Sequence, residues 1–407
     1  MGDGWKIACA GALAFLVVTL LIPVCRRFAL ARGITDGPAQ GKFHRAPTPY
    51  LGGVAIAVAA LGSAIVLPGW PRSSLLILVA ACLMSVAGLV DDIRGLGATT
   101  RLAIEIPAAV VAVLAGARSD LFGYGFDFAI SVVFLVVLTN AFNLLDNMDG
   151  AAGAIGTTIA IGLAVAALIE GQVLVGGLAV VVAATCLGFL AYNWYPAAIF
   201  MGDAGSLFLG FLLAVIALML RTEVTHPASA LALVLLVGPA LFDTTLVVIS
   251  RVRSRRPIYI GGTDHTSHRL VLLGLTSVGA TATLIVATAL CSGLGVLVAV
   301  GSVPAVVIAP IVAIAAAVGL VLMLRVGVYK TDRGRGELVA HVRSQDPVVA
   351  VVDPVGAPDA VGGVLPNKVA TASVLNGFLR AAAENGDTLL PSHHVSVSEA
   401  TSGAEGV

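Results

Sequence analysis

The sequence predicts an all-α protein that crosses a membrane as a polytopic bundle of about eleven helices. Hydrophobic residues make up 58% of its 407 residues and charged residues only 11%, whereas soluble domains carry roughly 25% charged residues. The apolar residues stand in long unbroken runs, and a bilayer core needs about 20 such residues per helix. Because backbone groups in lipid must be paired within the protein, these runs predict transmembrane helices, and their length excludes a β-barrel. The net charge is zero, which gives no indication of nucleic-acid binding.

Each expected span is an apolar segment delimited by polar or turn-forming residues. The first is predicted to be a retained helix rather than a signal peptide, because Arg26 and Arg27 follow the apolar run instead of preceding it. Pro107 interrupts the fourth segment, which makes it the least regular. The predicted spans are 7–24, 51–67, 74–90, 102–116, 128–145, 153–169, 173–191, 205–220, 230–249, 278–300 and 305–325.

Basic residues gather in alternate loops, and loops rich in Lys and Arg face the cytoplasm. This asymmetry predicts an N-terminus outside and a C-terminus inside the cell. Residues 1–330 form the predicted membrane domain, and residues 331–407, rich in Gly, Pro, Ser and Asp, form a polar, largely disordered cytoplasmic tail. The basic residues are Arg26, Arg27, Arg32, Lys42, Arg45, Arg94, Arg101, Arg251, Arg253, Arg255 and Arg256.

Five polar clusters interrupt the apolar chain, and the order of the spans puts all five on the cytoplasmic face. Ionisable groups at such places are functional candidates. The clusters are KFHRAPTPYLGG (42–53), GLVDDIRG (88–95), NAFNLLDNMDG (140–150), FMGDAGS (200–206) and GGTDHTSHRL (261–270).

The second and third clusters supply carboxylates and amides. Asp91 and Asp92 are adjacent, so on a helix they diverge by about 100° and serve different roles; a solvated helix end is the alternative. Asn140, Asn143 and Asp146 follow at intervals of three and share one helix face. Their oxygens suit a hard cation and their amide groups can donate to phosphate. A helix end followed by a turn is the simpler explanation, but it does not account for Asn140.

The last two clusters add a further carboxylate and basic groups. Asp203 stands between glycines, either as a metal ligand approached closely by its partners or as a helix cap. His265 and His268 are a weak zinc signal without further ligands, and with Arg269 they better suit phosphate oxygens; a solvated loop is the alternative. Arg45 in the first cluster adds a basic group. Together the residues indicate Mg²⁺, a polyanion and phosphoryl chemistry at the membrane surface.

In combination these motifs resemble the polyprenyl-phosphate N-acetylhexosamine-1-phosphate transferases. The resemblance rests on PTPYLGG, DD after a span, NxxNxxDxxDG, MGDxGS and an HxxH loop, over roughly residues 20–325. It implies that a sugar-1-phosphate passes from a UDP-sugar to undecaprenyl or another polyprenyl phosphate, with release of UMP. It also implies dependence on Mg²⁺, with Mn²⁺ as a substitute.

The resemblance, with the polar face that carries Asn140, also implies roles for individual residues. DNMDG has Asn147 where the family has glycine, and three consecutive histidines of the muramoyl-pentapeptide branch are absent, which favours GlcNAc as the sugar. The expected pathways are lipopolysaccharide, teichoic acid or arabinogalactan synthesis. The roles are catalysis by Asp91, Asp92 and Asp146, metal binding by Asp203 and Asn143, and substrate binding by Arg45, Asn140, Asp149, His265, His268 and Arg269.

Alternative functions are a secondary transporter, a phospho-N-acetylmuramoyl-pentapeptide transferase, or a non-catalytic scaffold. Transporters place polar residues near the bilayer midplane and often carry internal repeats, whereas here the polar residues crowd one face. The expected partners are a UDP-sugar, a polyprenyl phosphate and the membrane, and a homodimer is left open. The expected location is the plasma membrane, multi-pass, with the active site facing the cytoplasm.

Overall fold

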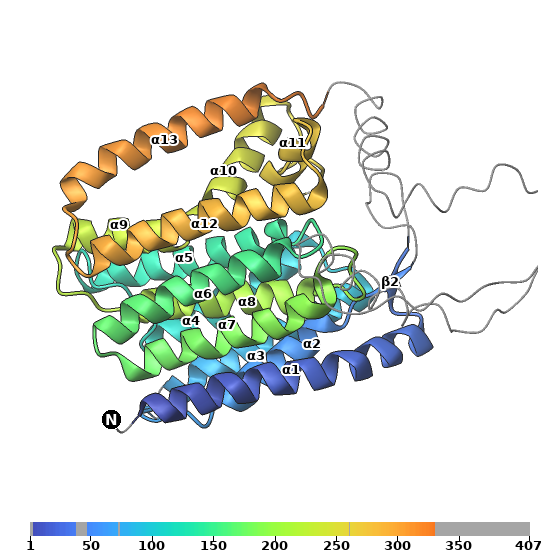
Figure 1. The fold of residues 1–407 in the computed structure, drawn as a ribbon, viewed down its shortest axis with the longest axis horizontal. Helices are drawn as coiled ribbons and strands as arrows, with labels where there is room; N and C mark the ends of the chain where they lie inside the picture. Colours follow the sequence, from blue (N-terminus) through green and yellow to red (C-terminus); the bar gives the residue numbers. More distant parts are fainter. Residues whose placement is uncertain (1–2, 38–46, 72–73, 260, 330–407) are drawn as a thin grey trace, which may run out of the picture. The chain divides into compact units, whose positions relative to one another are not determined.

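The computed structural model describes residues 3–37, 47–71, 74–259 and 261–329, and these residues are almost entirely helical (Figure 1). Two short strands, β1 (Thr35–Asp36) and β2 (Thr48–Pro49), pair antiparallel between the first two helices. The helices are α1 (Gly4–Arg32), α2 (Gly52–Ala64), α3 (Leu75–Arg94), α4 (Ala98–Leu114), α5 (Tyr124–Leu145), α6 (Ala151–Ile169), α7 (Val173–Asn193), α8 (Gly202–Met219), α9 (His226–Leu236), α10 (Gly238–Arg253), α11 (Thr266–Leu272), α12 (Ser277–Ala299) and α13 (Ala305–Arg325).

The chain is a polytopic helical membrane protein. Among the described residues, eight helices are long and apolar enough to span a bilayer, or nine if α9 and α10 form one bent span. Ten of the eleven predicted segments each overlap one helix, and the ninth overlaps two. α2 has only 13 residues, about 20 Å at the helical rise. The number of eleven spans and the orientation of the termini therefore remain predictions. The tail 331–407 lies outside the described residues.

The predicted ninth span is broken into two helices. α9 and α10 meet at an angle of 74°, and Pro239 stands in the first turn of α10. Proline has no backbone N–H to continue a helix, and the break falls just before it, at Val237, which ends α9 and precedes α10. Pro107, by contrast, lies inside α4 without ending it.

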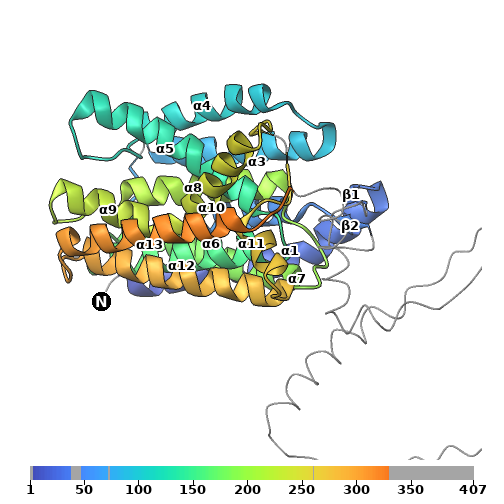
Figure 2. The ribbon, with the colours of Figure 1, turned by 90° about the horizontal axis from the view of Figure 1, so that it is seen from above.

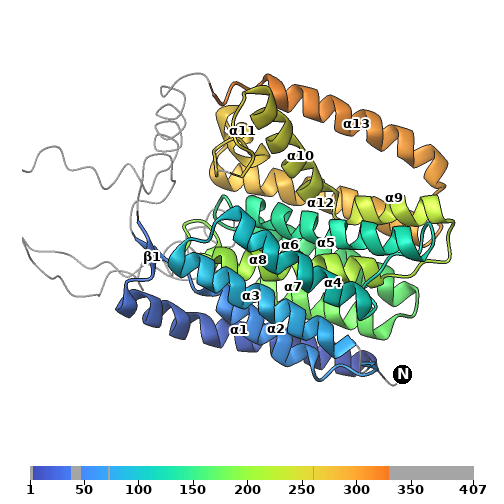
Figure 3. The same cartoon turned by 180° about the vertical axis from the view of Figure 1, so that it is seen from behind.

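α8 is the centre of the bundle. Every residue from Ala204 to Leu218 is buried, and the helix packs against α2, α3, α5, α6 and α7. Figures 2 and 3 show α4 on the face of the bundle opposite α7 and α12. α13 has no buried residue, so its apolar side chains are placed to face lipid.

Glycines let α2 and α3 approach the start of α8 at backbone distance. A Cβ added to Gly53 would lie 2.1 Å from the backbone nitrogen of Gly205, and one added to Gly88 would lie 2.1 Å from the carbonyl oxygen of Asp203. Only glycine tolerates such contacts. The MGDAGS segment is thereby pinned between two helices.

The four predicted polar clusters that the structure describes in full (88–95, 140–150, 200–206 and 261–270) lie at one end of the bundle (Figure 1). The ends of α3, α5 and α10 and the starts of α8 and α11 meet there, beside β1 and β2 and opposite the labelled N-terminus (Figures 1 and 3). The strand segment docks on the MGDAGS segment through three backbone bonds: Phe200 N–H to Pro49, Gly52 N–H to Phe200, and Gly53 N–H to Met201.

Candidate active site

Asp91 and Asp92, in the last turn of α3, point to different partners as their spacing requires. The Asp92 carboxylate accepts hydrogen bonds from the backbone N–H groups of Asp203 at 2.8 Å and Ala204 at 3.0 Å. It therefore satisfies N–H groups that the start of a helix leaves unpaired. Asp91 instead accepts from the N–H of Leu96 and is only 8% exposed. Asp92 fixes α8 in place, and Asp91 is left to face the site.

Arg101 of α4 joins two of the carboxylates. Its Nη1 lies 3.2 Å from Asp91 Oδ2 and 3.2 Å from Asp203 Oδ2. The amide nitrogen of Asn143 donates to Asp203 Oδ1 at 2.7 Å and to Ser206 Oγ at 3.0 Å. Four helices, α3, α4, α5 and α8, thus bring Asp91, Asn143 and Asp203 into one cluster, named here the acidic cluster together with Asp92 and Arg101.

Asp146 lies beside the acidic cluster. It is the residue that ends α5, and it is half-buried. Burial, aided by the negative charges of Asp203, Asp92 and Asp149, raises the pKa of Asp146 to about 8. Carboxylates that repel one another in this way attract a cation or share protons.

Asp149 ties two loops together. Its Oδ2 accepts from the backbone N–H of Ala197 at 2.9 Å, which links the end of α5 to the segment before α8. Asn193 does the same from the other side, accepting from Gly150 and donating to the carbonyl of Ile199. One oxygen of Asp149 is therefore already used to hold the loop before α8. The substrate contact of Asp149 stays a prediction.

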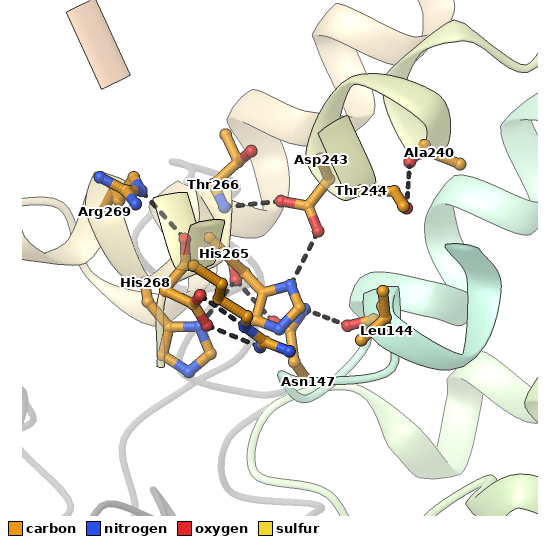
Figure 4. Close-up of polar contacts among 12 residues, drawn as sticks. Leu144, Asn147, Ala240, Asp243, Thr244, His265, Thr266, His268 and Arg269 are labelled. Atoms are coloured by element: carbon orange, nitrogen blue, oxygen red, sulfur yellow. Dashed lines mark hydrogen bonds and ion pairs between the residues drawn. The ribbon is translucent and has the colours of Figure 1, made fainter. Parts of the chain in front are cut away.

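The histidine loop forms a second group of polar side chains, centred on Asp243 of α10. His265 Nδ1 lies 2.8 Å from Asp243 Oδ2, and the N–H of Thr266 donates to Asp243 Oδ1 at 2.6 Å. Figure 4 shows the His265 ring aimed at Asp243. Because an ionised carboxylate can only accept, this contact places the proton of His265 on Nδ1 and leaves Nε2 for another partner.

His268 stands beside His265, with ring centroids 5.7 Å apart. Burial, reinforced by the charge of His265, lowers the pKa of His268 to about 3, so its ring is neutral. Ser267 between them donates to Asn147 Oδ1 at 2.6 Å. This contact joins the histidine loop to the DNMDG segment and hence to Asp146. Asn147, which stands where the family has glycine, thus accepts the hydrogen bond that links the two segments.

Arg269 makes several contacts within the protein. It is 1% exposed, and it donates to the carbonyls of Asp264, Met323 and Val326 and to the Ser250 hydroxyl. Met323 lies in the last turn of α13 and Val326 directly follows the helix, where cations are favourable. Figure 4 shows the side chain directed away from His268, and the substrate contact of Arg269 stays a prediction.

A buried ion pair holds the start of the histidine loop. Arg251 of α10 binds Asp264 through two hydrogen bonds of 2.8 Å, and the Tyr329 hydroxyl also donates to this carboxylate. Burial opposes ionisation of Asp264, but the hydrogen bonds from Arg251 and Tyr329 outweigh it and lower its pKa to about 2. Asp264 directly precedes His265, so this pair sets where the histidine begins.

Asn140 lies about one turn before Asn143 on α5. Its amide nitrogen donates to Glu105 of α4 and to the carbonyl of Val136, rather than to a carboxylate of the acidic cluster. The substrate contact of Asn140 stays a prediction. Arg45 lies outside the described residues.

The oxygen donors of the acidic cluster suit a hard divalent cation. Asp91 Oδ2 is buried without a hydrogen-bond donor, although Arg101 is 3.2 Å away. In the described part of the chain, no three His, Cys, Asp or Glu side chains form a closed metal cage. Magnesium usually binds through one or two carboxylates plus substrate phosphates, so an open pair such as Asp91 and Asp203 fits it.

Sequence reasoning missed the roles of Arg101, Glu105, Asp243 and Asp264. Arg101 entered the sequence prediction as one of the basic residues that indicate the cytoplasmic side. Asp243 was available as an ionisable residue within a predicted span, which marks a functional candidate. Arg101 and Glu105 are one helical turn apart in an apolar segment, which is the same kind of signal.

Comparison with known proteins identifies relatives of the chain. The family described as "Glycosyl transferase family 4" matches residues 74–221. A Bacillus subtilis protein described as a probable undecaprenyl-phosphate N-acetylglucosaminyl 1-phosphate transferase is 32% identical over 282 residues, covering 67% of this chain and 79% of that protein.

Two further relatives come from different branches. The decaprenyl-phosphate N-acetylglucosaminephosphotransferase of Mycobacterium tuberculosis is 31% identical over 309 residues, covering 66% of this chain and 76% of its own. A phospho-N-acetylmuramoyl-pentapeptide-transferase from Heliobacterium modesticaldum is 29% identical over 272 residues, covering 61% and 82%. The resemblance suggested by the motifs is confirmed, and the chain belongs to glycosyl transferase family 4.

Proposed function

We propose that the protein transfers N-acetylglucosamine-1-phosphate from UDP-GlcNAc to a polyprenyl phosphate and releases UMP. The proposal is supported by membership of glycosyl transferase family 4 and by the two N-acetylglucosamine phosphotransferases among the relatives. The reaction would be the first membrane step of a cell-envelope glycan pathway. The muramoyl-pentapeptide transferase of Heliobacterium modesticaldum matches a smaller share of this chain, 61%, than the two N-acetylglucosamine phosphotransferases, which match 67% and 66%.

One observation carries the proposal: two groups of polar side chains with different chemistry adjoin at one end of an apolar bundle. The acidic cluster offers oxygens for a cation, and the histidine loop offers nitrogen groups for phosphate. The contact between Ser267 and Asn147 connects them through the segment that carries Asp146. A lipid and a water-soluble nucleotide sugar can meet only where the membrane ends, and the site lies at such an end.

The reaction is a displacement at phosphorus. An oxygen of the lipid phosphate attacks the β-phosphorus of UDP-GlcNAc, the bond to the bridging oxygen breaks, and that oxygen leaves with UMP. Two polyanions have to approach each other, so neutralising charge is the main requirement. Mg²⁺, bound by Asp203 and Asp91 with Asn143 beside them, would supply that charge to the pyrophosphate oxygens.

The chain's own residues would position the phosphates and handle protons. Arg101 can turn its guanidinium from the carboxylates to phosphate oxygens, for which its planar fork is suited. His265, held by Asp243, presents Nε2 to the nucleotide side. Asp92 keeps Asp203 in place through its backbone N–H. A lipid phosphate needs little help to ionise near neutral pH, so positioning matters more than a dedicated base.

We place this end of the bundle in the cytoplasm of a multi-pass plasma-membrane protein. This end of the bundle carries Arg94 in the last turn of α3, Arg253 in the last turn of α10 and Arg256 just after it, and basic segments that flank the spans remain on the cytoplasmic side. UDP-sugars are cytoplasmic nucleotides, so the donor would reach the site directly. Cysteine labelling of a loop at each end, in intact and opened cells, tests the orientation.

The experiment is UMP release by the purified protein with undecaprenyl phosphate, Mg²⁺ and a panel of UDP-sugars. UDP-GlcNAc is expected to be the best donor, and Asp203→Asn is expected to reduce turnover by about 100-fold or more, the scale of a principal electrostatic group. Asp3→Asn is the matched control, because Asp3 contacts Lys6 at the other end of α1.

The alternatives give different results in the same assay. Preference for UDP-MurNAc-pentapeptide would identify the muramoyl branch. Movement of the nucleotide sugar into vesicles without UMP release would identify a transporter. Full activity of a folded Asp203→Asn protein would refute the site.

A further inference from the structure

Two charged groups of opposite sign lie one turn apart on α4, and each has a buried atom without a partner. Among the described residues, neither Arg101 Nε nor Glu105 Oε1 has a hydrogen-bond partner. Residues four apart on a helix are neighbours on one face. A buried donor and a buried acceptor left unpaired are each costly, and here they stand where a rotation of side chains would join them.

Glu105 is held ready for such a contact. The side chain is only 2% exposed, and the amide nitrogen of Asn140 donates to its other oxygen, Oε2. Oε1 is thus left for a second donor. The same bond explains why an asparagine stands so deep in the span: Asn140 orients Glu105.

Arg101 occupies the place that a cation would need. Its Nη1 lies 3.2 Å from both Asp91 and Asp203, the two carboxylates that suit a divalent ion. A guanidinium and a divalent ion repel each other at such distances, so the two cannot share these oxygens. When the ion binds, Arg101 has to leave them, and a partly buried charge without a new partner is unfavourable.

We propose that Glu105 is a positioning residue: it is the alternative partner that holds Arg101 when a divalent cation takes Asp91 and Asp203. Arg101 Nε then donates to Glu105 Oε1, and the terminal nitrogens of the guanidinium turn toward the phosphates. The carboxylates exchange one positive partner for another, and Arg101 keeps a counter-ion throughout. This inference rests on the cation site of the proposed function.

The simpler explanation is that Glu105 only adds negative charge near the site. Removing that charge would weaken cation binding whether or not Arg101 is present. In the proposed exchange, Glu105 acts through Arg101, so removing Arg101 should abolish the effect of Glu105. A double-mutant cycle separates the two explanations.

The experiment measures Mn²⁺ binding to the purified full-length protein without substrates, by electron paramagnetic resonance. Glu105→Gln is expected to raise the Mn²⁺ Kd by about fivefold or more, a coupling of the size found for residues in one network. Arg101→Gln is expected to lower the Kd, because the competitor is gone. The double variant is expected to bind within about twofold of Arg101→Gln.

A control variant and a second substitution at Glu105 distinguish a specific effect on Mn²⁺ binding from a loss of folding. Glu170→Gln, after α6 at the other end of the bundle, is expected to bind Mn²⁺ like the wild type. If Glu105→Gln does not fold, Glu105→Asp retracts the carboxylate by one methylene and is expected to raise the Kd by a smaller factor. Circular dichroism and thermal unfolding establish folding for each variant.

Two results overturn the inference while leaving the proposed function intact: an unchanged Kd in Glu105→Gln, or an equal effect of Glu105→Gln with and without Arg101. A different result refutes the cation site itself, namely Mn²⁺ binding by Asp203→Asn as tight as by the wild type.

Discussion

The substitution Gly88→Ala tests whether the approach of α3 to α8 builds the active site. A Cβ at Gly88 would lie 2.1 Å from the carbonyl oxygen of Asp203, 2.3 Å from its carbonyl carbon and 2.5 Å from the nitrogen of Ala204. All three are backbone atoms, so no side chain can move aside. Ordinary contact begins near 3.4 Å, so the helices have to separate locally by about 1.3 Å.

That separation acts directly on the proposed chemistry. Asp92 reaches the N–H groups of Asp203 and Ala204 at 2.8 and 3.0 Å, and an added gap of this size breaks both bonds. A misplacement of about 1 Å can cost roughly 100-fold in rate, and overpacking costs about 1–3 kcal/mol in stability. Gly88→Ala is therefore expected to lose about 100-fold in kcat for UMP release while remaining largely folded.

Substitutions at two other glycines serve as controls, because they distinguish a loss of site geometry from a general loss of helix packing. Gly62→Ala in α2 meets nothing within 4 Å, and Gly11→Ala in α1 meets the end of the Val180 side chain at 2.9 Å, far from the acidic cluster. Gly62→Ala is expected to match the wild type, and Gly11→Ala to lose stability without losing kcat. The reasoning is refuted if folded Gly88→Ala retains wild-type turnover, or if Gly11→Ala loses as much kcat as Gly88→Ala.

Three further predictions concern the histidine loop and the cation. Asp243→Asn should reduce kcat at least about tenfold, because the amide cannot both orient His265 and accept from Thr266; steady-state kinetics measure this. Asp264→Asn should lower the free energy of unfolding by about 3–5 kcal/mol, because Arg251 is left buried without its carboxylate, and denaturant unfolding measures this. The pKa of Asp264 is lowered to about 2, so this stabilisation should be complete above about pH 4 and lost as the pH falls through 2. Removal of divalent ions with EDTA should stop UMP release, and Mg²⁺ or Mn²⁺ should restore it.

Each of these predictions has a control. Asp120→Asn, in the loop between α4 and α5, changes a carboxylate remote from the site and should leave kinetics and unfolding unchanged. Equal kcat in Asp243→Asn and the wild type would show that His265 needs no orientation. Unfolding of Asp264→Asn within 1 kcal/mol of the wild type would mean that the buried pair contributes little. Activity in EDTA would exclude the divalent ion.

The sequence predicted the helices well, for a physical reason. A span in lipid has to be a long apolar helix, so hydropathy located eleven apolar segments, which overlap every helix except the short α11. It failed where composition carries no signal. The 74° break between α9 and α10 depends on Pro239, whereas Pro107 stays inside α4, and only the neighbouring helices decide between these outcomes.

The candidate site was predicted in part. The acidic and amide residues were visible because polar groups are rare in apolar segments, and the motifs assigned Asp91, Asn143 and Asp203 to a shared site. The contacts of Asn140 with Glu105 and of Arg269 with the end of α13 were not predicted, because an amide and a guanidinium suit phosphate as well as they suit these partners. The residue type limits which partners a side chain can bind, and the fold determines which of those partners lie close enough to be bound.

By itself, then, the sequence determined the membrane class, the helical segments and the family, because these follow from apolar length and from motifs read along the chain. Only the tertiary structure decided which partner each polar side chain of the motifs contacts. In the structure Asp92 accepts hydrogen bonds from the start of α8, and Arg101 lies between the carboxylates of Asp91 and Asp203. Asp243 contacts His265. Those pairings join residues from separate helices, and their distances are set by how closely glycines such as Gly88 let the helices pack.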